Sequence, residues 1–555
     1  MQASPQYSCA TDLKLSPKPA IDAIYAIQVS YALSLIAFIL IAVPWINPFA
    51  PGPTPSVVPM LVAWVCIALL TLTWAGAGGR PDRSSMVRAI AMAWVAAAAL
   101  SALIGLLQYL GATAWLGSWV SHPGVGQAYG NLRQRNQFAS LMNIGLAAVL
   151  WCASTWPVFT PTRLVFLRTQ IHQYMAWCCL LALAALLGIG NAASSSRTGL
   201  FQLGMVFVFC LLWYRRASLH KTSPDIQHAT EPRGRVYSVL IVAALAYSVA
   251  NVMLPWLVGL DPLGSGAVAR LREGDHACAS RLTLWRNVVY LIAQKPWLGW
   301  GWGELDYAHF ITLYPMPRFC DILDNAHNLP LHLAVELGLP AALCVCAISF
   351  YLVWRAKPWR ETDATRQLAW TVLAVILLHS LLEYPLWYGP FQMAVGLCGY
   401  LLWPKTYTQK MALTPYCHAL IAIIIIAFCA FAAWQYQLAS QIYLSPEQRR
   451  LAYREGTLAK TREVFLFQDQ VLFAELTTTD VNPNNSSYIN ALATDLLHFS
   501  PEARVVEQLI ESAYLLGRKE EARFYMARYQ AAFAQDFAQW RSNTSGVLPD
   551  SEVHR

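Results

Sequence analysis

A series of hydrophobic stretches, each long enough to cross a lipid bilayer as a helix, dominates the chain. About eleven of them suit a hydrocarbon layer of about 30 Å. They lie at residues 24–45, 58–77, 89–110, 138–157, 173–190, 198–214, 236–258, 328–353, 367–383, 390–403 and 413–435. A lipid layer offers the backbone no hydrogen bonds, so each stretch is expected to be helical. The sequence therefore predicts an all-α polytopic membrane protein with about eleven (10–12) transmembrane helices.

The composition agrees with this fold class. Of the 555 residues, 56% are hydrophobic and 13% are charged, and the mean hydropathy is +0.39. These values are typical of a multi-pass membrane protein in contact with a lipid bilayer. The net charge of +8 is better explained by basic loops on one side of a membrane than by binding to nucleic acid. We therefore expect no nucleic-acid partner.

Basic residues are distributed unequally between the loops. Most lie in the loops that follow even-numbered stretches, whereas the opposite short loops hold only Arg133, Arg135 and Arg197. The positive-inside rule then places the N-terminal segment 1–23 in the cytoplasm. We expect the first hydrophobic stretch to be retained, and not removed as a signal peptide. An odd number of helices puts the C-terminus in the periplasm, if the chain lies in a bacterial inner membrane.

Two further parts are expected beside the helices. The transmembrane domain, 24–435, includes a large outer loop at 259–327, and a helical periplasmic domain follows at 436–555. Residues 504–539 alternate apolar and charged positions at helical spacing, and Gly517 suits the end of a helix. This domain resembles either a tetratricopeptide-like hairpin or a generic helical tail.

Of the 13 cysteines, only Cys278 and Cys320 fall in the outer loop. In an oxidising compartment they would form a disulfide. Two free thiols are the alternative that the sequence leaves open.

Polar groups gather where the outer loop meets the stretch 328–353. An ionisable group at such a boundary is costly unless it is paired or used. Asp324 or Asn325 could simply cap a helix, but capping does not explain His327. The imidazole titrates near neutral pH, which makes His327 the best candidate for a proton acceptor. Asp324 is expected to orient its ring.

Two acid–histidine pairs follow at the spacing of one helical turn. His332 and Glu336 are four residues apart, as are His379 and Glu383. Residues at this spacing lie on one helix face and can pair with each other. The alternative for the second pair is a buried polar network that ties helices together.

Arginines from three outer loops form the clearest binding signal. They are Arg133, Arg135, Arg197, Arg281 and Arg286. A guanidinium group binds phosphate through two parallel hydrogen bonds. Contact with lipid headgroups explains any single arginine equally well, but convergence of three loops would create a shared diphosphate site.

Signatures of other chemistry are lacking in the sequence. Gly299, Gly301 and Gly303 do not form a dinucleotide fingerprint, and the tryptophans between them favour an interfacial turn able to stack on sugars. No early outer loop carries Asp-x-Asp, and no cysteines and histidines have the spacing of zinc ligands. We therefore expect no metal and no cofactor.

Three motifs resemble the O-antigen ligase superfamily, and within it the PglL-type bacterial protein O-oligosaccharyltransferases. The pattern formed by His327, Asn328, Leu331, Glu336 and Gly338 resembles the ligase signature. Residues 130–139 resemble the element that sets protein ligases apart from lipopolysaccharide ligases, and residues 379–388 also resemble the protein-ligase subgroup. The resemblance covers most of residues 110–530.

This resemblance implies transfer of an oligosaccharide from undecaprenyl diphosphate to a Ser or Thr hydroxyl of a periplasmic protein, often a pilin. It also implies that the transfer needs no metal. Position by position, it makes His327, Gln134 and Tyr384 catalytic and assigns the diphosphate to Arg135, Arg197 and Arg281. The supporting residues would be Asp324, Asn328, Glu336, His379, Glu383 and Tyr388. A single displacement would invert the anomeric centre.

Other functions remain open from the sequence. The same superfamily includes ligases that act on lipid A–core and polymerases that lengthen O-antigen. A transporter of lipid-linked sugar would place ionisable sites near the middle of the membrane, often in two repeated halves. Here Glu336, His379 and Glu383 lie toward the outer ends of their stretches, which favours chemistry at the outer face.

Overall fold

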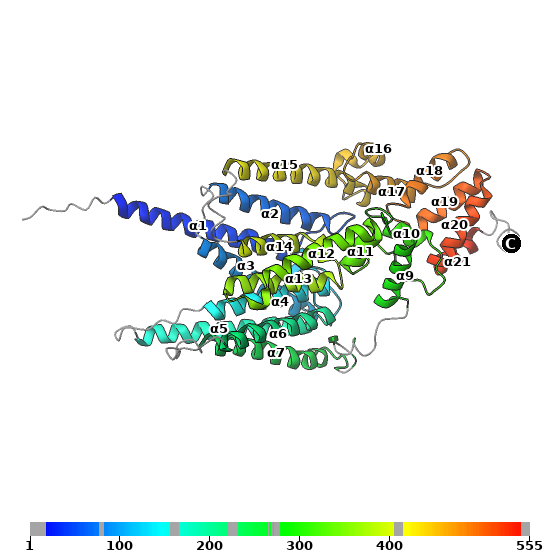
Figure 1. Cartoon of the computed structure of the whole chain (residues 1–555). Coiled ribbons are helices and arrows are strands. Elements are labelled where there is room, and N and C mark those ends of the chain that lie inside the picture. The colour runs from blue at the N-terminus through cyan, green and yellow to red at the C-terminus, as the bar shows by residue number, and fades with distance from the viewer. Residues whose placement is uncertain are drawn as a thin grey trace, which may run out of the picture.

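The computed structural model describes residues 18–76, 83–155, 166–219, 231–262, 264, 266–267, 270, 278–403 and 415–544. Within these ranges every regular element is a helix, and no strand is present. Figure 1 shows a bundle of long helices that continues, at one end, into a group of short helices. The all-α prediction is confirmed for this part of the chain.

The long helices follow the hydrophobic stretches. They are α1 (Lys18–Ile46), α2 (Val57–Gly76), α3 (Arg83–Tyr109), α4 (Arg135–Thr155), α5 (Phe166–Ala193), α6 (Arg197–Leu219), α7 (Glu231–Leu257), α12 (Leu339–Ala356), α13 (Ala364–Ser380), α14 (Gly389–Leu402) and α15 (Pro415–Ser440). In the described residues, 8 helices are long and apolar enough to cross a membrane, and two shorter apolar helices are Ser30–Ile46 and Gly389–Leu402. The count of about eleven spans stays a prediction.

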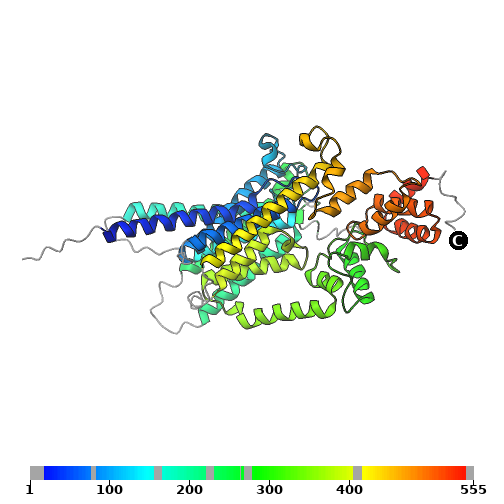
Figure 2. The ribbon, with the colours of Figure 1, turned by 90° about the horizontal axis from the view of Figure 1, so that it is seen from above.

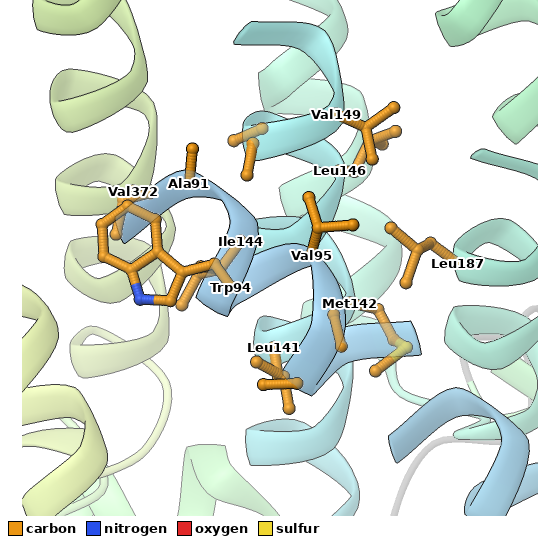
Figure 3. Packing of buried hydrophobic residues seen from close by; sticks show 14 of the residues in the cluster. Ala91, Trp94, Val95, Leu141, Met142, Ile144, Leu146, Val149, Leu187 and Val372 are labelled. Atoms are coloured by element: carbon orange, nitrogen blue, oxygen red, sulfur yellow. The ribbon is translucent and has the colours of Figure 1, made fainter. Parts of the chain in front are cut away.

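The centre of the bundle is formed by α3 and α4. Most of α4 is buried, and its residues Leu141 and Ile144 pack with Trp94 of α3 in a continuous apolar core (Figure 3). A Cβ atom on Gly145 would lie 2.3 Å from the Cβ of Ala98, so the small residue lets the two helices approach closely. This packing gives the first turn of α4 a rigid base.

The prediction of one helix over 328–353 was wrong. The structure divides this stretch into α11 (Leu329–Leu337) and α12, with Gly338 between them at φ +85°. A Cβ atom on Gly338 would lie 2.2 Å from the carbonyl oxygen of Trp297, so the site demands glycine. Residue Ala342 alone is buried in α12, and this helix stands apart from the other long helices (Figure 2).

Short helices and turns connect the bundle to the site. The 3₁₀ helices are η1 (Ala114–Trp119), η3 (Pro358–Arg360), η4 (Pro385–Trp387), η5 (Gln441–Tyr443) and η6 (Leu451–Tyr453). The outer loop folds into α9 (Arg281–Gln294) and α10 (Leu305–Ile311), which pack with α11.

The glycine-rich turn between α9 and α10 is fastened to the end of α11. Trp300 N donates to Val335 O at 2.8 Å, and Gly301 N donates to Glu336 O at 3.0 Å. A turn is therefore present here, with α11 as its partner, while its position at a membrane interface stays a prediction. Cys278 and Cys320 form a disulfide with a Cα–Cα distance of 5.3 Å, as predicted for an oxidising compartment.

A group of short helices follows α15. They are α16 (Thr457–Thr461), α17 (Gln468–Thr478), α18 (Ser486–Leu496), α19 (Ala503–Leu515), α20 (Lys519–Ala532) and α21 (Ala534–Thr544). Gly517 ends α19 at φ +75°, as predicted, and Arg518 N donates to Ala513 O at 2.8 Å. Phe310 of α10 is buried in the core of these helices, so the outer loop and the C-terminal helices pack against each other.

Candidate active site

The carboxylate of Glu383 is the centre of the candidate site. It lies in the turn between α13 and η4, not on a helix, because α13 ends at Ser380 and Pro385 opens η4. The prediction that Glu383 lies at the end of a span is therefore corrected. Its side chain is only 5% exposed.

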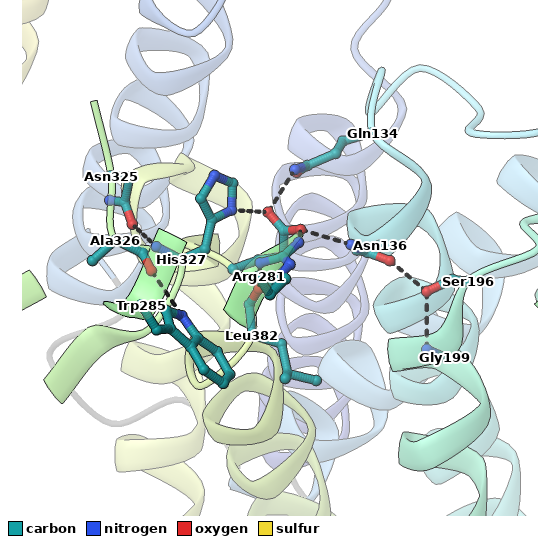
Figure 4. Close-up of polar contacts among 11 residues, drawn as sticks. Gln134, Asn136, Ser196, Gly199, Arg281, Trp285, Asn325, Ala326, His327 and Leu382 are labelled. Carbon is teal, nitrogen blue, oxygen red and sulfur yellow. Dashed lines mark hydrogen bonds and ion pairs between the residues drawn. The ribbon is translucent and has the colours of Figure 1, made fainter. Parts of the chain in front are cut away.

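Four donors from three parts of the chain surround this carboxylate. Oε2 lies 2.9 Å from Nδ1 of His327 and accepts from Nε2 of Gln134 at 3.2 Å. Oε1 accepts from Nδ2 of Asn136 at 3.0 Å and from the guanidinium group of Arg281. Figure 4 shows these four side chains directed toward one point. Each oxygen of Glu383 thus has two partners.

Charge outweighs burial at Glu383. Burial alone would raise the pKa of this carboxyl, but the hydrogen bond from His327 and the charge of Arg281 lower it to about 2. The carboxylate is therefore ionised at neutral pH and can only accept hydrogen bonds. Nδ1 of His327 must carry the hydrogen in this contact, which leaves Nε2 as the nitrogen that can accept a proton.

The backbone around His327 is held in a restricted conformation. His327 has φ +49°, in the left-handed region that non-glycine residues rarely occupy. Its N–H donates to Oδ1 of Asn325 at 2.9 Å, and Asn328 caps α11 by accepting from Leu331 N at 3.1 Å. The cap is thus Asn328 and neither Asp324 nor Asn325. Asp324 is exposed, and Glu383 takes the place predicted for it as the partner of the His327 ring.

Two tyrosines pack behind the imidazole. The ring of Tyr384 meets the ring of His327 edge to face, with centroids 5.1 Å apart, and Tyr388 stacks on Tyr384 at 6.0 Å. Burial raises the pKa of both phenols. They are therefore neutral at physiological pH, and Tyr384 limits the positions that the His327 ring can adopt.

A cavity of about 730 Å³ adjoins Glu383. Its lining includes five arginines: Arg133, Arg135, Arg197, Arg270 and Arg281. Three of them are the first residues of α4, α6 and α9, where the positive end of the helix dipole also favours an anion. The predicted convergence of Arg135, Arg197 and Arg281 is therefore present. Arg286, which was predicted to belong to this set, is not among the lining residues, whereas Arg270, which was not predicted, is one of them.

The predicted pair His332–Glu336 is present on α11. The Nε2 and Oε2 atoms are 3.5 Å apart, and the side chains are 3% and 2% exposed. Burial lowers the pKa of His332 to about 4 and raises that of Glu336 to about 7. Since Trp387 also meets His332 edge to face at 5.0 Å, the pair links α11 to η4.

His379 does not form the predicted pair with Glu383, because the helix ends between them. Its Nδ1 lies 2.9 Å from Oγ of Ser140 on α4, and Nε2 of Gln202 on α6 donates to the same hydroxyl at 2.8 Å. His379 is completely buried. The alternative interpretation, a polar network that ties helices together, is therefore the correct one.

Asn136 is a residue of the site that was not predicted from the sequence. This residue follows Arg135 in the motif 130–139, and its amide joins Glu383 to Ser196, whose Oγ donates to Oδ1 of Asn136 at 2.5 Å. Its position inside that motif was the available signal. The partner Ser196 belongs to the distant serine-rich loop, so their contact could not be inferred.

Family models match three segments of the chain. Residues 128–152 match the model described as "Protein glycosylation ligase", and residues 182–346 match "O-Antigen ligase". Residues 367–546 match "Virulence factor membrane-bound polymerase, C-terminal". Glu383 and its four donors thus come from all three matched segments: Glu383 from one, and the donors from the other two.

Two curated proteins of Acinetobacter baylyi are similar to the chain. The "General O-oligosaccharyltransferase" is 25% identical over 343 residues, which are 60% of this chain and 54% of that protein. The "ComP-specific O-oligosaccharyltransferase" is 23% identical over 277 residues, which are 50% of this chain and 44% of that protein. The chain spans about half the length of these curated relatives. No solved structure matches it significantly. The family matches and these relatives identify the chain as a relative of the O-antigen ligase superfamily and of its PglL-type protein glycosylation branch.

Proposed function

We propose that the chain transfers a preassembled oligosaccharide from an undecaprenyl-diphosphate carrier to Ser or Thr hydroxyls of periplasmic proteins, with pilins among the acceptors. The observation that carries this proposal is the position of the His327–Glu383 contact beside the arginine-lined cavity. The printed names of the two relatives support the same activity. The enzyme would lie in the bacterial inner membrane, with its N-terminus in the cytoplasm and its site and C-terminus in the periplasm.

The arginine-lined cavity supplies what a diphosphate leaving group needs. Negative charge grows on the bridging oxygen as the bond to the anomeric carbon breaks. Arg135, Arg197 and Arg281 would hold the diphosphate at the N-termini of α4, α6 and α9 and stabilise that charge. The three guanidinium groups would thus stabilise the charge of the leaving diphosphate.

His327 would act on the acceptor. Its Nδ1–H donates to Glu383, so neutral Nε2 is available to take the proton of the attacking hydroxyl. Glu383 then stabilises the imidazolium that forms. Gln134 would hold Oε2 of Glu383 in place, and Tyr384 would confine the imidazole ring of His327. One direct attack on the anomeric carbon would invert its configuration.

A second candidate function is polymerisation of the glycan. The match of residues 367–546 to a polymerase C-terminal model favours it, because that segment contains Glu383 and Tyr384. A polymerase would present a sugar hydroxyl, in place of Ser or Thr, to the same imidazole. The O-antigen ligase match also keeps transfer to lipid A–core as an alternative.

Expression in a bacterium that lacks its own ligases tests these functions against one another. The cell would supply a lipid-linked oligosaccharide, a pilin-type acceptor and an intact lipid A–core. We expect sugar on the pilin with the wild type and with His122→Ala, and none with His327→Ala. His122 is an exposed histidine that contacts Thr113 and Gly117, so it controls for loss of a histidine as such. Sugar on lipid A–core alone, or a longer glycan alone, would overturn the proposal.

A further inference from the structure

The amide of Asn136 is held in one orientation from behind. Its Oδ1 accepts from Oγ of Ser196 at 2.5 Å, and that hydroxyl in turn accepts from Gly199 N at 3.0 Å (Figure 4). Because Oγ has its hydrogen directed at Oδ1, the amide cannot turn over without losing this bond. Its Nδ2 group is thereby aimed at Oε1 of Glu383, at 3.0 Å.

The two partners of Oε1 differ in what an incoming diphosphate would do to them. Arg281 contacts Oε1 and also lines the arginine cavity, so its charge would be shared with a diphosphate bound there. Asn136 also lines the cavity, but it is neutral and anchored to the serine-rich loop through Ser196. Its hydrogen bond to Glu383 therefore carries no positive charge that a bound diphosphate would draw away.

We propose that Asn136 is a positioning residue that keeps the carboxylate of Glu383 against His327 while Arg281 engages the diphosphate. This inference rests on the proposed function. Without the amide, Glu383 would follow Arg281 toward the cavity, and the Oε2 contact with the imidazole would lengthen. Asn136 thus acts on the acceptor side of the reaction through Glu383 and touches no reacting atom.

Several charged or titratable groups surround Glu383, and each can influence how a measured rate or modification varies with pH. His327 and Asp324 lie in the segment before α11, and Arg281 lies on α9. His379 lies on α13, and Tyr384 and Tyr388 flank η4. Arg133, Arg135, Arg197 and Arg270 line the cavity that Glu383 and Arg281 also line. A variant of Asn136 changes none of these groups directly.

The full chain in lipid nanodiscs would be compared as wild type, Asn136→Ala, Asn136→Asp, Ser196→Ala and Asn143→Ala. Asn143 is the matched control, a buried amide on the same helix. Its Nδ2 donates to Gly199 O at 3.2 Å and to Gln202 Oε1 at 3.2 Å, and it makes no contact with Glu383. Ser196→Ala leaves Asn136 in place but removes the bond that orients its amide.

The first readout is chemical and needs neither donor nor acceptor. Diethyl pyrocarbonate modifies neutral imidazole, and mass spectrometry of the peptide that contains His327 gives the modified fraction at each pH. Loss of the carboxylate contact makes imidazolium less stable, so the midpoint of modification should move to lower pH in Asn136→Ala. Ser196→Ala should move it in the same direction by less, and Asn143→Ala should leave it unchanged.

The second readout is transfer kinetics. We expect kcat of Asn136→Ala to fall by about tenfold to a hundredfold with an unchanged KM for the donor. Aspartate at this position donates to Glu383 only when it is protonated, so the rate of Asn136→Asp relative to the wild type should rise as the pH falls.

The outcomes separate this inference from the proposed function. If the wild type transfers no sugar to protein, the proposed function fails, and the modification of His327 still decides the role of Asn136. Equal modification midpoints for Asn136→Ala, Ser196→Ala and Asn143→Ala would overturn the positioning role. A raised donor KM with unchanged kcat in Asn136→Ala would also overturn it, because the amide would then serve the diphosphate.

Discussion

Nδ1 of His327 lies 2.9 Å from Oε2 of Glu383, although 56 positions separate the two residues in the sequence. The contact joins the segment before α11 to the turn after α13. Oε1 of the same carboxylate meets Arg281, which lines the arginine cavity. One buried carboxylate therefore connects the residue proposed to take a proton with a residue proposed to hold the leaving group.

Glu383→Gln tests the charge of this carboxylate. Glutamine retains an oxygen that can accept from Nδ1 of His327, but it cannot stabilise imidazolium by charge. We expect kcat to fall by about a hundredfold or more, with little change in the KM for the acceptor. Steady-state kinetics on reconstituted protein would measure this. A KM effect without a kcat effect would show that Glu383 serves binding only.

Arg281→Lys tests whether the cavity binds through a guanidinium fork. Lysine keeps the positive charge but cannot form two parallel hydrogen bonds. The KM for the lipid-linked donor should rise, and the affinity for free inorganic diphosphate should fall in a direct binding measurement. Arg286→Lys is the control, since Arg286 lies on the same helix and does not line the cavity. Equal losses in both variants would contradict the assignment of the cavity.

Glu336 should make stability depend on pH. Burial raises the pKa of Glu336 from 4.5 to about 7, so the folded state binds more protons than the unfolded state between these values. Stability must then fall as the pH rises from 4.5 toward 7 and change no further above that. Glu336→Gln removes this penalty. The gain in unfolding temperature of the variant over the wild type should therefore be larger at pH 8 than at pH 5. A pH-independent effect would show that burial does not disfavour ionised Glu336.

The disulfide between Cys278 and Cys320 should stabilise the outer loop. Its cysteines are 42 residues apart, and closing a loop of this size contributes roughly 4 kcal/mol on the chain-entropy model. Reductant should lower the unfolding temperature of the wild type and leave Cys278→Ser/Cys320→Ser unchanged. If complete reduction leaves the unfolding temperature of the wild type unchanged, the disulfide does not make this contribution.

Local patterns predicted the features that depend on nearby residues. Hydrophobic length located the helices, the glycine at 517 marked the end of α19, and the i,i+4 spacing predicted the pair His332–Glu336. These features need only the periodicity of one element. The arginines were also recognisable as a set, because guanidinium groups on three separate loops suit a shared phosphate site.

Contacts between distant segments were beyond the sequence. Gly338 and Pro340 were local signals of the helix break within a hydrophobic run, but only the carbonyl of Trp297 behind Gly338 explains why glycine is required there. Asp324 was the nearest carboxylate to His327 along the chain, but Glu383 is the nearest in space. The role of Asn136 depends on Ser196, which another loop supplies. Tertiary packing, and not local propensity, chose each of these partners.

Transfer by the purified chain is the most direct test of the central claim. The reaction would contain undecaprenyl-diphosphate-linked oligosaccharide and a purified pilin, and the intact mass of the pilin would be followed over time. We expect a mass increase equal to one whole glycan with the wild type, the same increase at a far lower rate with Glu383→Gln, and none with His327→Ala. An unmodified pilin with active donor and correctly folded wild type, or equal modification by His327→Ala, would contradict it.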